Sequence, residues 1–277
     1  MSSGTINIEL TRFEKGIILP VNDLISVEEP LEIQIVSGDK ANRSTSSISV
    51  TMRTPGNDGE LATGFLLTEG IIYDHKDVIK IETVSRNVIK VHLDQTIKIE
   101  AQSLTRNFYT TSSCGICGKA SIDAIRVTSE ILKNRMVIDS SILNGLTAKL
   151  YESQENFQST GGLHASALFD KEGNLKLLRE DVGRHNALDK LIGNQFFNEN
   201  IPIQDCILLV SGRASFELVQ KAAVAGISIL VAIGAPSSLA VELAKEKGIT
   251  LVGFLKSDRF NVYTHKKRIE VNEQRRI

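Results

Sequence analysis

Tryptophan is absent from this 277-residue chain, and aromatic residues make up only 5% of it. Surfaces that bind single-stranded nucleic acid stack the bases on exposed aromatic rings, so this scarcity argues against such a function. An excess of charge of one sign is lacking too, because 32 Lys and Arg residues nearly balance 33 Asp and Glu residues. A balanced chain gains little attraction to nucleic acid or to an anionic membrane. We expect neither as a partner.

Long hydrophobic runs are also missing. The most apolar stretch, residues 222–236, is shorter than the roughly 20 residues that a membrane-spanning helix needs. The first residues, MSSGTINIELTRFEKG, contain neither the apolar core nor the cleavage site of a secretory signal. We therefore expect a cytosolic protein. The chain has only three cysteines, an odd number, which in a cytosolic protein argues against a disulfide scaffold.

The first hundred residues have the pattern of strands. Residues 31–38 and 46–56 alternate apolar and polar side chains, and residues 77–94 read as a hairpin that turns at Ser85, Arg86 and Asn87. Between them, residues 58–72 have the apolar spacing and the acidic start of a helix. The pattern predicts a β-rich N-terminal domain with one helix, over residues 1–109.

The remainder, residues 110–277, predicts an α/β domain. Helices are expected over 117–136 and 142–157, and a pair of strands over 161–170 and 174–180. From residue 204 onward, apolar strands alternate with amphipathic helices. The expected strands are 204–212, 227–234 and 249–254, and the expected helices are 214–226 and 236–248. Such alternation is typical of parallel strands joined by crossover helices.

Cys114 and Cys117 form a C-x-x-C pair in the segment TTSSCGICGKASIDAI. Three chemistries use such a pair: a zinc site, a redox disulfide, or a thiolate that carries a sulfur atom as a persulfide. A structural zinc site needs four ligands, but Cys206 lies in an apolar strand and the five histidines are scattered. The proline and nearby tryptophan of thioredoxin-like redox motifs are absent. The carrier hypothesis fits an exposed Ser/Gly-rich loop beside Lys119, although spacing alone leaves all three open.

Polar side chains gather where the predicted strands end. His164 follows a Gly-Gly pair, and residues 179–189 bring together seven polar or charged side chains. We expect Asp181 to cap a helix beginning at Val182, which would place it on the same helical face as His185. Ligands of open α/β sheets bind at such strand-to-helix transitions.

Two further loops, in the sequences VSGRASFE and AIGAPSS, each follow a buried strand and precede a helix. Small residues and backbone amides before a helix favour an anion, and Arg213 in the sequence SGRAS could add a charged hydrogen bond. Lys256, Ser257, Asp258 and Arg259 follow the last predicted strand at the same edge of the sheet. Three polar loops on one rim predict a site for a phosphate-bearing or dinucleotide ligand.

Five motifs in this order resemble the formate dehydrogenase accessory sulfurtransferases, the FdhD family. The motifs are SSCGICGKASID, TGGLHASALFD, EDVGRHNALDKLIG, SGRASFELVQKAAVAGI and GITLVGFLKSDRFNVYTH. The resemblance implies a three-layer α/β sandwich whose mixed sheet is similar to the cytidine deaminase fold, and a homodimer. Deamination itself is not expected, because no histidine stands in the H-x-E pattern of the zinc deaminases and Ser113 replaces the proline before the cysteines.

The resemblance also implies a function. A cysteine desulfurase would pass sulfur to Cys114 as a persulfide, with Cys117 beside it. The sulfur would then go to the metal, molybdenum or tungsten, of the bis-(molybdopterin guanine dinucleotide) cofactor of formate dehydrogenase. No permanent metal is expected. The predicted cofactor-binding residues are His164, Arg184, His185, Ser211, Gly212, Arg213, Phe254, Leu255, Lys256, Ser257, Asp258 and Arg259. The alternative is a non-catalytic, cofactor-binding chaperone in which the cysteine pair is structural or binds metal.

Overall fold

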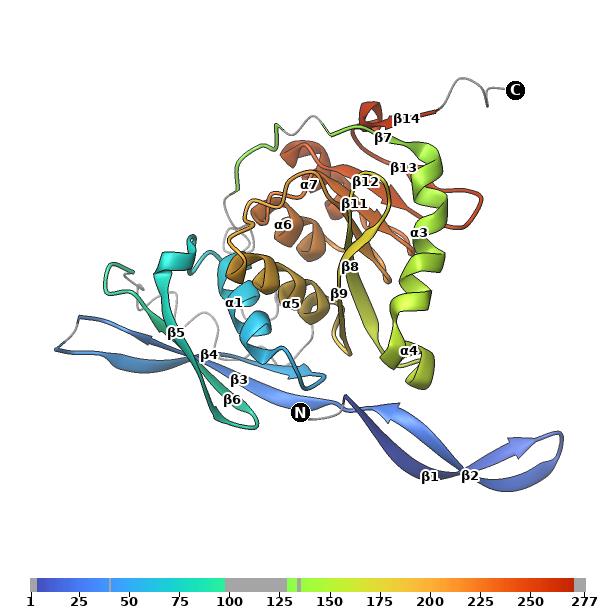
Figure 1. The fold of residues 1–277 in the computed structure, drawn as a ribbon, viewed down its shortest axis with the longest axis horizontal. Helices are drawn as coiled ribbons and strands as arrows, with labels where there is room; N and C mark the ends of the chain where they lie inside the picture. Colours follow the sequence, from blue (N-terminus) through green and yellow to red (C-terminus); the bar gives the residue numbers. More distant parts are fainter. Residues whose placement is uncertain (1–3, 40, 98–128, 134–135, 272–277) are drawn as a thin grey trace.

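The computed structural model describes residues 4–39, 41–97, 129–133 and 136–271. These residues form a projecting hairpin, a four-stranded sheet and a larger six-stranded sheet with helices (Figure 1). Cys114, Cys117, the expected domain boundary at residue 109 and most of the helix expected over 117–136 lie outside the described residues.

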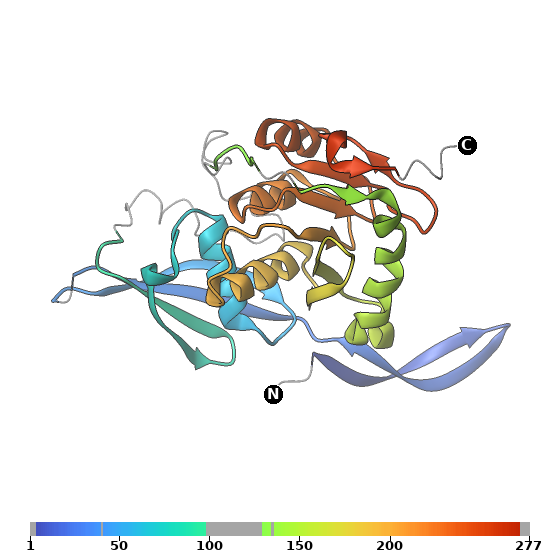
Figure 2. The ribbon, with the colours of Figure 1, turned by 45° about the horizontal axis from the view of Figure 1, so that its top comes forward.

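The chain begins with a long antiparallel hairpin, here called the arm. It consists of β1 (Thr5–Glu14) and β2 (Ile17–Ser26), paired over ten positions. The turn between them, Lys15 and Gly16, has φ of 50° and 80°, the left-handed values of a tight hairpin turn. The base of the arm contacts the body, where Ser26 Oγ hydrogen-bonds Thr160 Oγ1 at 2.8 Å. The rest of the arm extends away from the body (Figures 1 and 2).

The second part of the N-terminal region is a sheet in the order β4-β3-β6-β5. Its elements are β3 (Glu29–Ser37), β4 (Ser44–Arg53), α1 (Asp58–Thr68), the short 3-10 helix η1 (His75–Asp77), β5 (Val78–Ser85) and β6 (Val88–Leu93). The alternation of the strands is explained by one face that buries Leu31, Ile33 and Ile35. The predicted strands, the helix and the hairpin over 77–94 are confirmed.

The larger sheet has the order β13-β12-β11-β10-β8-β9. Its strands are β8 (His164–Phe169), β9 (Leu175–Asp181), β10 (Ile207–Val210), β11 (Ile229–Ala232), β12 (Thr250–Gly253) and β13 (Asn261–Val262). Strands β10, β11 and β12 are parallel, as predicted, whereas β8, β9 and β13 join them through antiparallel pairs. The expectation of a mixed sheet is therefore confirmed.

Helices cover both faces of this sheet. On one face lie α5 (Arg184–Phe197), α6 (Phe216–Val224) and α7 (Ser238–Lys247), and on the other lies α3 (Ser140–Ser153), followed by α4 (Glu155–Thr160). The first core joins the α5–α7 side to the N-terminal sheet, and the second packs α3 on the opposite face. A small pair of strands, β7 (Ile138–Asp139) and β14 (Ile269–Glu270), lies beside the 3-10 helix η3 (Lys266–Arg268).

Two glycines bring α1 and α5 into direct backbone contact. A Cβ atom on Gly64 would lie 1.9 Å from the carbonyl oxygen of Asp189, and one on Gly193 would lie 1.9 Å from that of Glu60. Only glycine permits an approach this close. Arg179 of β9 adds a bidentate ion pair to Glu60, with Nε–Oε2 at 2.6 Å and Nη2–Oε1 at 2.7 Å. The N-terminal sheet and the larger sheet are therefore fixed to each other through α1.

A buried polar cluster lies behind this crossing. Lys221 Nζ donates to both carboxylate oxygens of Asp189 at 2.9 Å and to Thr68 Oγ1 at 2.8 Å, so α6, α5 and α1 share one network. Burial by itself would lower the pKa of Lys221, but the carboxylates of Asp189, Glu69 and Glu217 together outweigh that effect and raise the pKa. Lys221 therefore stays charged, and the cluster is an ion pair in the interior.

Candidate functional site

The predicted site residues in the described part of the chain meet at one rim of the larger sheet. The carboxyl ends of β10, β11 and β12 open into loops 211–215, 233–237 and 254–259. Because β8 runs antiparallel to β10, its first residue, His164, lies at this same edge. The helix after β9 also starts there. The rim therefore collects segments that are far apart in the sequence.

His164 and Gly212 face each other at the centre of this rim. A Cβ atom on Gly212 would lie 3.6 Å from the His164 ring and 4.0 Å from Cδ of Arg184, so the glycine leaves the space between them open. Ser211 fixes the loop to β8, because its Oγ accepts from the Ala165 amide at 2.9 Å and its own amide donates to the Ala165 carbonyl at 3.0 Å. Partial burial, with the charge of Arg184, lowers the pKa of His164, which favours a neutral ring.

His185 forms a buried pair with a glutamate from the next helix. Its Nε2 lies 2.8 Å from Glu217 Oε2 and 3.3 Å from Ser215 Oγ. Ser215 caps α6, since its Oγ accepts from the Leu218 amide. Glu217 and Ser215 are functional candidates that the sequence reasoning missed. The sequence does contain the pattern of a serine cap followed by an acidic residue in the first turn of a helix. It gives no local sign that these residues contact a histidine 30 residues before the serine.

Backbone hydrogen bonds hold the loop over 254–259, one to the neighbouring loop and one within the loop itself. The Phe254 amide donates to the Gly234 carbonyl at 3.0 Å, and the Lys256 amide donates to the Arg259 carbonyl at 2.8 Å. Phe254 has φ of 54°, a strained value for a residue with a side chain. Lys256, Ser257, Asp258 and Arg259 are exposed, whereas the side chain of Leu255 is fully buried in the core on the α3 side. Leu255 can therefore offer a ligand only its backbone.

The rim favours an anionic ligand. Helices α5, α6 and α7 all begin there, and the positive ends of their dipoles add to the exposed charges of Arg213, Lys256 and Arg259. Arg184 Nε is buried and forms no hydrogen bond with any residue that the structure describes. A buried guanidinium N–H without an acceptor is well suited to a ligand oxygen. The Gly212 space, the Arg184 donor and the surrounding charge together fit a phosphate-bearing group.

The helix prediction at Asp181 was wrong. Asp181 ends β9, and α5 begins three residues later at Arg184 without a side-chain cap. The Asp181 carboxylate instead accepts from the Gly183 amide at 2.8 Å and forms an ion pair with Lys190 at 2.7 Å. Asp181 is fully buried, so it belongs below the rim and shares no helical face with His185. An aspartate just before a helix is a common N-cap residue, which explains the prediction. The position of Asp181 in β9 instead turns its side chain into the interior.

Thr54 joins this buried pair to the N-terminal sheet. Its amide donates to Asp181 Oδ2 at 3.2 Å, and its carbonyl accepts from Lys190 Nζ at 2.8 Å. The Thr54 hydroxyl lies 3.2 Å from the amide of Val182, which is the entry to α5. The segment after β4 therefore supports the rim from below.

The remaining sequence predictions have mixed outcomes. Cys114 and Cys117 lie outside the described residues, so their placement beside the rim stays a prediction. Cys206 is a half-buried free thiol packed against the first core, and burial raises its pKa, which favours the inert thiol form. Within the described ranges, no group of three or more His, Cys, Asp or Glu side chains is arranged to hold a metal. In the same ranges, no helix is both long and apolar enough to cross a membrane.

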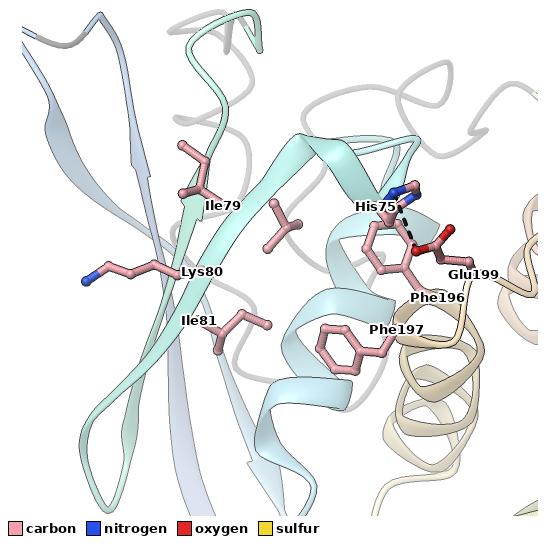
Figure 3. A pocket seen from close by; sticks show the side chains of 8 residues that line it. His75, Ile79, Lys80, Ile81, Phe196, Phe197 and Glu199 are labelled. Atoms are coloured by element: carbon pink, nitrogen blue, oxygen red, sulfur yellow. Dashed lines mark ion pairs between the residues drawn. The ribbon is translucent and has the colours of Figure 1, made fainter.

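A hollow of about 400 Å³ lies away from the rim (Figure 3). It is lined by His75, Val78, Ile79, Lys80, Ile81, Phe196, Phe197 and Glu199. His75 faces Glu199 across it, with Nε2 and Oε1 3.7 Å apart, while Lys80 points away from the hollow (Figure 3). None of the predicted site residues contributes to it.

The fold and the rim define an α/β protein whose glycine-lined, positively charged edge suits a phosphate-bearing ligand. The FdhD/NarQ family profile matches residues 26–270. The chain belongs to this family, and the resemblance inferred from the five motifs is confirmed.

Relatives from distant organisms are similar over nearly their whole length. The sulfur carrier protein FdhD of Mycolicibacterium paratuberculosis is 46% identical over 271 residues, with 94% of this chain and 97% of the relative covered. That of Sulfurisphaera tokodaii is 44% identical over 248 residues, covering 90% and 92%. The fold is also similar to the crystal structure of a putative formate dehydrogenase accessory protein from Desulfotalea psychrophila. The TM-score is 0.77 at 23% identity, covering 96% of this chain and all of that one.

Proposed function

We propose that this protein is a cytosolic sulfur carrier in the maturation of formate dehydrogenase. The observation that carries the proposal is its similarity, over more than nine tenths of the chain, to relatives named sulfur carrier protein FdhD. The C-x-x-C pair supplies the thiolate that such a role requires. The anion-favouring rim supports a phosphate-bearing client, and we identify this client as the bis-(molybdopterin guanine dinucleotide) cofactor. A homodimer and a deaminase-like layering of the larger sheet complete the proposal.

The proposed chemistry has two steps. In the first, the Cys114 thiolate attacks the outer sulfur of a persulfide on a cysteine desulfurase, and the desulfurase leaves as a thiolate. In the second, the outer sulfur leaves Cys114 as sulfide and becomes a ligand of the cofactor metal. Reducing that sulfur takes two electrons, which Cys117 can supply by forming a disulfide with Cys114. A thiol reductant would then restore the pair.

The rim residues are assigned to holding the cofactor. Arg184 would donate its free Nε–H to a phosphate oxygen, and the Gly212 space would admit the phosphate beside His164. His185, held by Glu217, would fix the start of α5 against α6. Backbone hydrogen bonds between the loops of the rim would hold these residues in place.

Intact mass spectrometry after incubation with a cysteine desulfurase and cysteine tests the first step. We expect the wild type to gain about 32 Da, one sulfur atom, and to lose it with a thiol reductant. Cys114→Ala should gain nothing, and Cys206→Ala is the matched control that keeps the gain. If the wild type stays unmodified, or Cys114→Ala is modified equally, the carrier function is wrong.

The same variant separates a carrier from a chaperone that only binds the cofactor. Cys114→Ala should abolish the activation of formate dehydrogenase while guanosine diphosphate, used as a probe of the rim, still binds in calorimetry. Arg184→Gln should weaken that binding about tenfold or more, because a charged hydrogen bond to phosphate is lost. Full activation of formate dehydrogenase by Cys114→Ala would favour the chaperone.

A further inference from the structure

The arm exposes an apolar surface that nothing in the described structure covers. Ten residues at about 3.3 Å each make it about 33 Å long, and most of this length stands clear of the body (Figures 1 and 2). An isolated two-stranded hairpin is marginally stable in water unless a further strand or another element packs on it. Several large apolar side chains on it are nevertheless 40–60% exposed, such as Ile17 at 60% and Ile6 at 52%.

The pairing register sorts the arm into two faces. Cross-strand partners share a face, and faces alternate along each strand. One face, here called the aliphatic face, consists of five rows: Ile6–Ile25, Ile8–Asp23, Leu10–Val21, Arg12–Leu19 and Glu14–Ile17. Seven of its ten side chains are Ile, Leu or Val. The opposite face is mixed and includes Thr5, Asn7, Glu9, Thr11 and Asn22, with apolar residues such as Phe13 and Ile18 near the turn.

Two of the three charges on the aliphatic face lie symmetrically about its middle. The central row is Leu10–Val21, with Arg12 one row toward the turn and Asp23 one row toward the base. Neither of the two forms a salt bridge among the described residues, and they are too far apart along the arm to pair within one copy. Glu14 lies at the end of the face beside the turn, where its carboxylate can remain in water.

We infer that the aliphatic face binds the same face of a second copy of this chain. A two-fold axis through the Leu10–Val21 row places the Arg12 row of one arm on the Asp23 row of the other, so two ion pairs form around an apolar centre. Isologous interfaces require this kind of self-complementarity. The rows of Arg12 and Asp23 are next to the central row. The twist of the two-stranded ribbon therefore turns them only slightly relative to that row. The inference deepens the homodimer part of the proposed function.

Two charge reversals test this surface. Arg12→Asp and Asp23→Arg should each weaken self-association at least tenfold in analytical ultracentrifugation over a concentration series, because each sets like charges opposite one another twice. An equimolar mixture of the two variants should restore the wild-type dimer, since the mixed pair brings opposite charges together at both contacts. A variant that had merely misfolded could not be rescued by mixing. Glu9→Arg, on the opposite face, is the control that leaves association unchanged.

Three outcomes would overturn the inference. The wild type could be monomeric at every concentration, the single variants could dimerise like the wild type, or the mixture could fail to restore the dimer. A dimer that resists both reversals would place the interface elsewhere on the molecule. The sulfur-carrier function is assessed separately by the mass gain on Cys114, so failure of one proposal does not imply failure of the other.

Discussion

At the scale of single residues, the charge state of His164 at the rim is set by its neighbours. His164 is half-buried and shares its surroundings with Arg184 and His185, and these three influences favour the neutral ring. A neutral imidazole beside a guanidinium leaves Arg184 as the cation of this pair, and both side chains border the Gly212 space. The rim can then attract an anion without the mutual repulsion of two adjacent positive charges.

The lowered pKa of His164 has a consequence for stability. Below pH 6.5, the ordinary pKa of a histidine, the unfolded chain takes up a proton at this residue more readily than the folded chain does. The free energy of unfolding should therefore fall as the pH is lowered from 6.5 through the folded pKa, and it should be independent of this group at higher pH. We expect His164→Gln to make the fall between pH 7 and pH 5 shallower in urea titrations. Parallel curves for the two proteins would contradict this.

At the scale of secondary-structure elements, α1 and α5 cross so closely that the contact requires glycine. Among the glycines of the described residues, Gly64 and Gly193 leave the least room for a Cβ atom. A side chain on Gly64 would overlap the main chain of α5, which cannot rotate away as a side chain can. Helix α3 offers a contrast, because a Cβ atom on Gly145 would meet nothing within 4 Å. The same substitution should therefore act in opposite directions on the two helices.

Gly64→Ala should destabilise the protein by about 3 kcal/mol or more, because α1 must move away from α5. Gly145→Ala should leave the stability unchanged or raise it by about 0.5–1 kcal/mol, the gain expected from helix propensity alone. Urea-induced unfolding followed by circular dichroism measures both. Equal effects of the two substitutions would show that the close approach of α1 and α5 is unimportant.

The elements that sequence reasoning predicted well are those with a strong local pattern. The apolar runs of β10, β11 and β12 and the amphipathic patterns of α6 and α7 predicted the alternation of strand and helix directly. The start of α5 was misplaced because a buried aspartate and an N-cap look alike until burial is known. The helix expected over 142–157 divides at Gln154 into α3 and α4.

Contacts between distant segments could not be predicted in the same way. His185 and Glu217 are 32 positions apart, and Thr54 reaches Asp181 across 127 positions. Such pairings depend on how the sheets pack, which no local pattern contains. The arm was not predicted as an individual element, although β1 and β2 alternate over part of their length, because neither of its faces is buried in a core. The family resemblance, in contrast, came from motifs that could be read in order.

At the scale of the whole molecule, the two sheets share one core. Side chains of the N-terminal sheet, of α1 and of the α5–α7 layer belong to a single buried cluster. The ion pair of Arg179 with Glu60 and the Lys221–Asp189–Thr68 network cross the same boundary. Two regions joined in this way should behave as one cooperative unit.

Hydrogen exchange followed by mass spectrometry measures this cooperativity. We expect peptides from α1 and β3 to exchange with the same opening free energy as peptides from α5 and β10, because neither sheet can open while the shared core is intact. The arm provides an internal contrast and should exchange faster in dilute protein. Loss of protection in the N-terminal sheet well before the larger sheet would show that the two fold separately.

The contacts of Thr54 restrict how this molecule can be recombined with its relatives. One residue after β4 donates to Asp181, accepts from Lys190 and meets the entry to α5, while Gly64 and Gly193 each require the bare backbone of the other helix. A chimaera that takes its first hundred residues from one parent and the remainder from another would have to match at all of these positions at once. A junction between the two sheets is therefore a poor place to recombine the chain. We expect the two halves to have been inherited together.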